Sequence, residues 1–171
     1  RIADMLLHPG APFSYEGATH SYPDVGLVYW AGDNPFHHHQ DLNRLAKAWE
    51  RPETIVVQDP FWTTTPPRAD IALPAETIGP EMPEVVNDLP AGARSEYIFA
   101  MRQAVPSLHQ SRSDHEIARH LASLLNVEAE FSEGRDEMAW IEHLYQDTRQ
   151  DVRERLGVDL PAFDAFWAQG H

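Results

Sequence analysis

The stretch of sequence that decides the fold is Gly32-Asp33-Asn34-Pro35-Phe36-His37-His38-His39-Gln40-Asp41. It follows the apolar run 25–31 and leads into a segment with helical spacing. In open α/β sheets, ligands bind beyond the carboxyl ends of the strands, where glycine lets backbone amides approach a phosphate. The turn at residues 32–34 is therefore the first place to look for function.

The segments around this turn predict a parallel sheet. Residues 25–31 are apolar throughout, as is typical of a strand buried on both faces, and residues 54–59 are rich in β-branched side chains. Between them, residues 38–51 have one helical stripe of Leu42, Leu45, Ala46 and Trp49. A short helix or turn over 61–68 and a third strand at 70–73 follow. This order is typical of a parallel sheet with right-handed connections, so we expect an α/β fold.

The remaining segments are assigned more simply. An N-terminal helix precedes a Pro- and Gly-rich loop at 8–24, and residues 74–94 lack any periodicity, which is typical of a functional or mobile segment. Residues 97–105 fit a strand or a short helix. The capping box at residues 113–116 opens a helix that we expect to bury Ile117, Leu121 and Leu124. Helices are also expected at about 135–156 and at 162–169.

Composition narrows the class of protein. The chain has 171 residues, which suits one domain with its own core, and 42% hydrophobic residues, which indicates a globular protein. Its formal net charge of -14 argues against nucleic acid and against an anionic membrane surface as partners. No apolar run is long enough to span a bilayer, and without cysteine there is no thiolate chemistry or disulfide.

Five motifs follow one another along the chain: residues 28–41 around Asn-Pro-Phe-His-His-His-Gln, 52–63 with Gln-Asp-Pro-Phe-Trp-Thr, 69–75, 133–140 and 163–167. In their order and spacing they resemble the molybdopterin oxidoreductases of the dimethyl sulfoxide reductase family, and most closely its biotin sulfoxide and trimethylamine N-oxide reductase branch. The likeness covers essentially the whole chain, and the run from Asn34 to Gln40 is its most specific part.

The resemblance implies an excised piece, because family members are several times longer. It implies a Rossmann-like, three-layer α/β domain over residues 1–171, with a parallel sheet and flanking helices. Its implied role is to help hold one of two molybdopterin guanine dinucleotides in a molybdenum enzyme that removes oxygen from an S-oxide or N-oxide. The serine that ligates the metal in the family lies in a preceding segment, so we expect this piece to be inactive alone.

The predicted cofactor-binding residues combine pattern and resemblance; they are Gly32, Asn34, His38, Gln40, Gln58, Asp59 and Asp88. Gly32 and Asn34 would meet the pyrophosphate or its sugar. The pattern alone favours an ordinary strand-to-helix turn, whereas the resemblance favours contact with the ligand. Asp59 ends a strand, where its carboxylate would accept two N–H bonds from the guanine edge or bonds from the ribose hydroxyls. The alternative is that it simply turns the chain before Pro60.

The three consecutive histidines do not predict a metal site. Neighbouring positions in a helix point about 100° apart, so three in a row cannot converge on one ion as residues at i and i+4 do. The resemblance instead implies that His38 and Gln40 face the dinucleotide. The charged residues over 128–154 alternate in sign, which is typical of a solvated helix face.

Two departures from the family pattern concern the same cofactor. Asp33 stands where glycine is usual, and a carboxylate beside a pyrophosphate is electrostatically unfavourable. The family's Glu-Arg-Asn-Asp motif is matched only by Val85-Val86-Asn87-Asp88, after several extra residues. Loss of that Arg removes a charge-assisted donor from the pterin or phosphate side.

Three hypotheses follow for function. The first is the cofactor-binding piece of a molybdenum reductase; the alternatives are a ligand-free folded scaffold and a nucleotide-binding module without catalysis. The expected partners are the other domains of the parent reductase and the dinucleotide. We also expect some self-association through Phe61, Trp62 and the helix at 162–169, limited by the negative charge. The biotin-sulfoxide-like pattern favours the cytoplasm over the periplasm.

Overall fold

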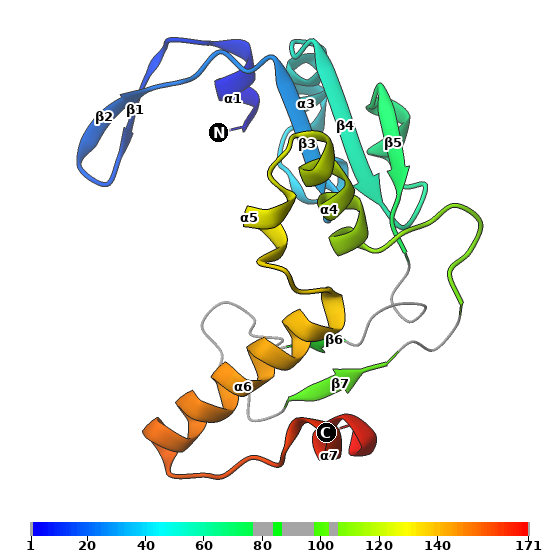
Figure 1. The fold of residues 1–171 in the computed structure, drawn as a ribbon. Helices are drawn as coiled ribbons and strands as arrows, with labels where there is room; N and C mark the ends of the chain where they lie inside the picture. Colours follow the sequence, from blue (N-terminus) through cyan, green and yellow to red (C-terminus); the bar gives the residue numbers. More distant parts are fainter. Residues whose placement is uncertain (1, 77–83, 87–97, 103–105, 171) are drawn as a thin grey trace. The chain divides into compact units, whose positions relative to one another are not determined.

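The computed structural model describes residues 2–76, 84–86, 98–102 and 106–170 (Figure 1). The chain forms two compact units, Arg1–Ala75 and Glu76–His171, and each is described by itself. The expectation of one domain over residues 1–171 stays a prediction.

The first unit is built on a three-stranded parallel sheet in the order β3-β4-β5. Its strands are β3 (Leu27–Ala31), β4 (Thr54–Asp59) and β5 (Ile71–Pro74). The connection from β3 to β4 contains the helices α2 (Pro35–His38) and α3 (Leu42–Trp49), and η1 (Pro66–Arg68) precedes β5. The predicted α/β class with a parallel sheet and flanking helices is confirmed, and it is compatible with a Rossmann-like domain.

The core of this unit lies between α3, the N-terminal helix α1 (Ile2–Leu7) and one face of the sheet. Leu45, Ala48 and Trp49 follow helical spacing and are buried against Ile55 and Val57 of β4. An ion pair between Arg44 and Asp4 also joins α3 to α1. Burial of this stripe fixes the helix on the sheet and therefore fixes the turn that precedes it.

The helix expected from residue 38 begins later than predicted. His37 and His38 end the short helix α2, His39 is already extended, and α3 starts only at Leu42. The break is set by Asp41, whose backbone is left-handed (φ 53°) and whose carboxylate accepts from the Arg44 N–H at 3.1 Å. The three histidines therefore do not share one helix.

The expectation that residues 25–31 form a strand buried on both faces is wrong. Strand β4 is buried on both faces, but β3 is not, since Leu27 is 58% exposed and Tyr29 is 38% exposed. Among the described residues β3 pairs with only one strand, and only its Val28 and Trp30 face packs on the core.

The predicted loop at 8–24 contains an antiparallel hairpin of β1 (Pro12–Tyr15) and β2 (Ala18–Ser21), which extends away from the sheet (Figure 1). Its turn places Glu16 and Gly17 at positive φ, and the Phe13 ring stacks on Tyr22 at 4.5 Å. Paired aromatic rings thus hold a segment whose glycines and prolines indicated a loop.

In its described residues, the second unit combines a short antiparallel pair of strands with four helices. The strands are β6 (Glu84–Val86) and β7 (Phe99–Met101), and the helices are α4 (Asp114–Leu124), α5 (Glu128–Ser132), α6 (Glu137–Leu156) and α7 (Phe163–Gln169). For residues 97–105 a strand or a short helix was expected, and the described part contains the strand β7. The helix α5 was not predicted. The core joins α6 to α7, where the Tyr145 ring stacks on Phe166 with centroids 4.3 Å apart.

Burial in this unit differs from the sequence-based expectation at α4 and α7. Leu121 and Leu124 were expected in the core but are 41% and 69% exposed, and Ala122 is the buried residue of α4. Phe163 and Phe166 are buried under α6, so α7 does not form the predicted exposed patch. Helical spacing identifies one apolar face, but the packing partner decides which positions are covered.

Candidate functional site

The candidate site is the carboxyl edge of β3 and β4. The parallel register pairs Ala31 with Gln58, and the Gly32 N–H donates to the Gln58 carbonyl at 3.3 Å, so both chains leave the sheet side by side. Gly32 and Asp33 then have positive φ values of 69° and 57°. This left-handed pair, which glycine adopts readily, turns the chain sharply from β3 into α2.

Asn34 ties that turn to the loop that follows β4. Its side-chain oxygen accepts hydrogen bonds from the Thr65 hydroxyl at 2.5 Å and from the Thr64 hydroxyl at 3.2 Å. Thr65 is fully buried, so its hydroxyl needs this acceptor. The structure therefore places Asn34 and the end of β4 on the same edge of the sheet.

Asp59 is the last residue of β4 and organises the same loop. Its Oδ1 accepts from the Phe61 N–H at 2.8 Å, and its Oδ2 accepts from the Thr63 hydroxyl at 3.0 Å. Both oxygens therefore accept hydrogen bonds from the protein itself. This is the chain-turning role that the sequence pattern offered as the alternative to guanine binding. A carboxylate oxygen accepts more than one hydrogen bond, so capacity for a ligand remains.

The other predicted residues separate into different environments. Gln58 is 4% exposed, and its side-chain oxygen accepts from the Tyr29 hydroxyl at 2.5 Å. Asp88 lies outside the described residues. His38 and Gln40 line a cavity beside α1, so the six described residues are not all gathered in one place.

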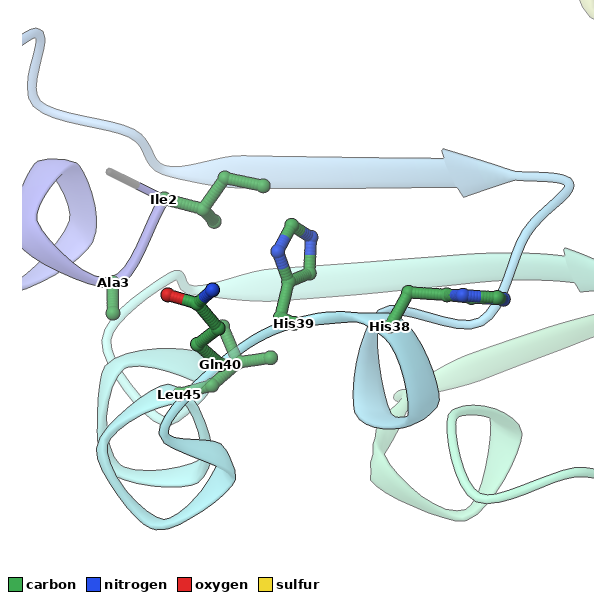
Figure 2. Close-up of a pocket in the computed structure, with 6 residues that line it drawn as sticks. All are labelled: Ile2, Ala3, His38, His39, Gln40 and Leu45. Atoms are coloured by element: carbon green, nitrogen blue, oxygen red, sulfur yellow. The ribbon is translucent and has the colours of Figure 1, made fainter. Parts of the chain in front are cut away.

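That cavity has a volume of about 260 Å³ and lies between α1 and the segment joining α2 to α3. Figure 2 shows its lining residues, which are Ile2, Ala3, His38, His39, Gln40 and Leu45. The side chain of Gln40 points toward Ile2 and Ala3 of α1, and the His39 ring lies beside Ile2. The side chain of His38 points away from them, toward the turn after β3 (Figure 2). One wall is apolar and the other carries imidazole and amide groups.

Asp33 brings negative charge to the start of the turn. Its Oδ1 accepts from the Asn34 N–H at 2.7 Å and lies 3.1 Å from His38 Nε2. A backbone N–H that a phosphate would use in a strand-end turn is therefore bonded to a carboxylate of the protein itself. Sequence reasoning noticed the charge but not these contacts.

Sequence reasoning also missed Thr64, Thr65 and Tyr29, whose hydroxyls hold Asn34 and Gln58. The run of three threonines after Pro60 was the available signal, because hydroxyl side chains in a loop bond to neighbouring polar groups. Nothing in the sequence indicated which amide each hydroxyl would meet.

A second polar cluster, in the other unit, joins the starts of α4 and α6. The Ser113 hydroxyl caps α4 by accepting from the Glu116 N–H at 2.9 Å, and it donates to Glu137 Oε2 at 2.9 Å. His115 Nδ1 lies 4.0 Å from Glu137, and its buried Nε2 has no partner among the described residues. Burial, followed by the nearby Arg119 charge, lowers the pKa of His115 below its usual 6.5.

This cluster holds helices and does not form a catalytic triad. In a triad the imidazole contacts the nucleophilic hydroxyl, whereas here the Ser113 hydroxyl bonds to the carboxylate. Within the described ranges, no three His, Cys, Asp or Glu side chains are grouped so that they could hold a metal ion. No helix in that part of the chain is long and apolar enough to cross a membrane.

Comparison with known proteins identifies the family of this chain. The family model described as molybdopterin oxidoreductase matches residues 5–124, which include the sheet and the turn at 32–34. The chain is 55% identical over its whole length to a biotin sulfoxide reductase of Cereibacter sphaeroides, covering 22% of that protein. It is 48% identical over 99% of its length to a dimethyl sulfoxide/trimethylamine N-oxide reductase of the same organism, covering 20% of it.

A trimethylamine-N-oxide reductase of Haemophilus influenzae is 43% identical over 99% of the chain. The chain belongs to the molybdopterin oxidoreductase family, as the sequence motifs predicted. It spans about a fifth of the length of these curated relatives.

Proposed function

We propose that this chain holds part of a molybdopterin guanine dinucleotide within a larger molybdenum reductase acting on S-oxides or N-oxides. The observation that carries the proposal is the shared edge of β3 and β4, where Asn34 joins the turn at 32–34 to the loop at 59–65. Dinucleotides bind at such strand ends in open α/β sheets. The names of the relatives, biotin sulfoxide reductase and dimethyl sulfoxide/trimethylamine N-oxide reductase, support the reaction class.

The groups at this edge fit a phosphate-linked dinucleotide. The Asn34 oxygen is engaged by Thr64 and Thr65, so its NH₂ group is the part that donates to a ligand oxygen. Gly32 keeps the backbone of the turn free of a side chain, with nothing within 4 Å of an added Cβ. Asp59 would accept from the guanine edge with its remaining lone pairs.

The cavity beside α1 offers a second set of contacts. His38 and Gln40 supply ring nitrogen and amide groups over an apolar wall, which suits a ligand that is partly planar and partly polar. Gln58 and Asp88 remain predicted contacts only. The Gln58 side chain is 4% exposed and already accepts from the Tyr29 hydroxyl, and Asp88 lies outside the described residues. In the longer protein, the bound molybdenum cofactor supplies the chemistry of oxygen removal.

Other parts of the parent reductase are the proposed partners of this chain. Phe61 and Trp62 are 60% and 74% exposed, and such apolar surface favours contact with another protein segment or weak self-association. The isolated chain is proposed to be inactive, so an assay with reduced viologen and an S-oxide should show no turnover. We place the parent in the cytoplasm rather than the periplasm.

A ligand-free scaffold is the second candidate function, and the Asp33 contacts favour it. The Asp33 carboxylate already occupies the Asn34 N–H, and a net charge of -14 repels a pyrophosphate. The third candidate lies between these two. It is a nucleotide-binding module that still recognises guanine but no longer binds the pterin.

Thermal denaturation with GDP separates these candidates. A ligand that binds only the folded state stabilises it by mass action, so GDP at about 100 times its dissociation constant adds about 2.7 kcal/mol. A rise in melting temperature that Asp59→Ala abolishes supports the cofactor-binding role. No rise at GDP concentrations of about 1 mM or above favours the scaffold.

A further inference from the structure

The loop that follows β4 presents Trp62, a side chain to which the proposed function assigns no contact with the dinucleotide. Trp62 is 74% exposed, the highest value among the large hydrophobic side chains that the structure describes. Full burial of a large aromatic side chain is worth several kcal/mol, so an exposed tryptophan is unusual unless it contacts something. Its backbone, in contrast, is tightly held.

Two hydrogen bonds to Asp59 fix the residues on either side of Trp62. The Phe61 N–H donates to Asp59 Oδ1 at 2.8 Å, and the Thr63 hydroxyl donates to Asp59 Oδ2 at 3.0 Å. In addition, the Thr63 N–H donates to the Phe61 carbonyl at 2.8 Å, which closes a three-residue turn with Trp62 at its centre. The carboxylate of Asp59 therefore bonds to the residue before Trp62 and to the residue after it. The exposed indole belongs to a turn that is fixed at the carboxyl end of β4.

The rest of the loop is anchored as well. Thr64 and Thr65, the next two residues, bond to Asn34 of the neighbouring turn. The exposed indole thus lies on a loop fixed at both ends and adjacent to the groups proposed to meet a dinucleotide. Binding of a planar ligand therefore costs little conformational entropy, because the loop is already ordered.

We propose that Trp62 is the platform on which the guanine base stacks, and that Asp59 is the positioning residue that fixes its turn. This proposal rests on the proposed function and adds a base-recognition element to it. Indole is uncharged, so stacking does not suffer from the acidic surface that opposes the phosphates. Base recognition would then carry a large share of the affinity in a chain with a net charge of -14.

The test compares GDP with inorganic pyrophosphate, which has the phosphates but no base, by calorimetry on the 171-residue chain. Trp62→Ala should weaken GDP binding between about five- and about 150-fold, as loss of one stacked base does. It should leave pyrophosphate binding unchanged, and Trp62→Phe should keep most of the GDP affinity. Because Trp62 is exposed, the melting temperature without ligand should stay the same.

Matched variants at Thr63 test the positioning by Asp59. Thr63→Val removes the hydroxyl that bonds to Asp59 Oδ2 and should weaken GDP but not pyrophosphate, whereas Thr63→Ser should restore the affinity. GDP bound equally by the wild type and Trp62→Ala overturns the stacking proposal while the proposed function survives. Equal loss of GDP and pyrophosphate also overturns it, since that indicates a collapsed loop. Failure of the wild type to bind GDP overturns both.

Discussion

Substitution of Asn34 should destabilise the chain through the hydroxyl that Asn34 satisfies. In Asn34→Ala, the Thr65 hydroxyl loses its acceptor while remaining fully buried, and the Thr64 hydroxyl loses a longer, exposed contact of 3.2 Å. Leaving a buried donor unsatisfied costs about 1–3 kcal/mol, and the exposed bond adds little. For a chain of this size, each kcal/mol lowers the melting temperature by about 2–4 °C.

The measurement is urea unfolding followed by tryptophan fluorescence, which reports on the first unit through Trp30, Trp49 and Trp62. Asn34→Asp is the matched control, because a carboxylate oxygen still accepts from both threonines. It should retain most of the stability and lose any binding of GDP, since it has no NH₂ group and adds negative charge. Wild-type stability in Asn34→Ala, or equal destabilisation in both variants, would refute this account of the tie between the two strand ends.

Three further predictions concern charge, pH and the core. Asp33→Gly should strengthen pyrophosphate binding, measured by calorimetry, because it frees the Asn34 N–H and removes a negative charge; weaker or unchanged binding contradicts the role assigned to Asp33. The pKa of His115 is lowered in the folded state by burial, so below about pH 6.5 the unfolded chain takes up the proton first. The stability that His115 contributes is therefore present above that pH and lost as the pH falls, and urea unfolding at a series of pH values should show a smaller loss in His115→Asn than in the wild type. Leu45→Ala should lower the unfolding free energy by about 2–5 kcal/mol, because Leu45 is 2% exposed in the core. Leu124→Ala, at 69% exposure, should change it by less than about 0.5 kcal/mol. Similar losses in the two variants would contradict the assigned cores.

Much of the first unit was predictable because its signals are local. The β-branched residues of β4, the stripe of Leu45 and Trp49, and the glycine after β3 each constrain a few neighbouring residues. The motif around Asn34 also identified the family. Membership of a family, however, does not place a side chain.

The errors arose where local signals compete with contacts between distant residues. Prolines and glycines at 8–24 indicated a loop, but stacking of Phe13 on Tyr22 accompanies a hairpin there. Helical spacing marked Leu121 and Leu124 as core positions, yet a stripe shows only which positions share a face.

The sequence by itself determined the three strands of the parallel sheet, the helix α3 between the first two of them, and the family, since these depend on residue type and spacing along the chain. Only the tertiary structure decided that the Asn34 oxygen bonds to two threonines, that Gln58 is buried under Tyr29, and that Asp59 holds the turn around Trp62. The physical reason is that a hydrogen bond requires donor and acceptor to lie about 3 Å apart. That proximity depends on the register of β3 against β4, which brings together residues some thirty positions apart.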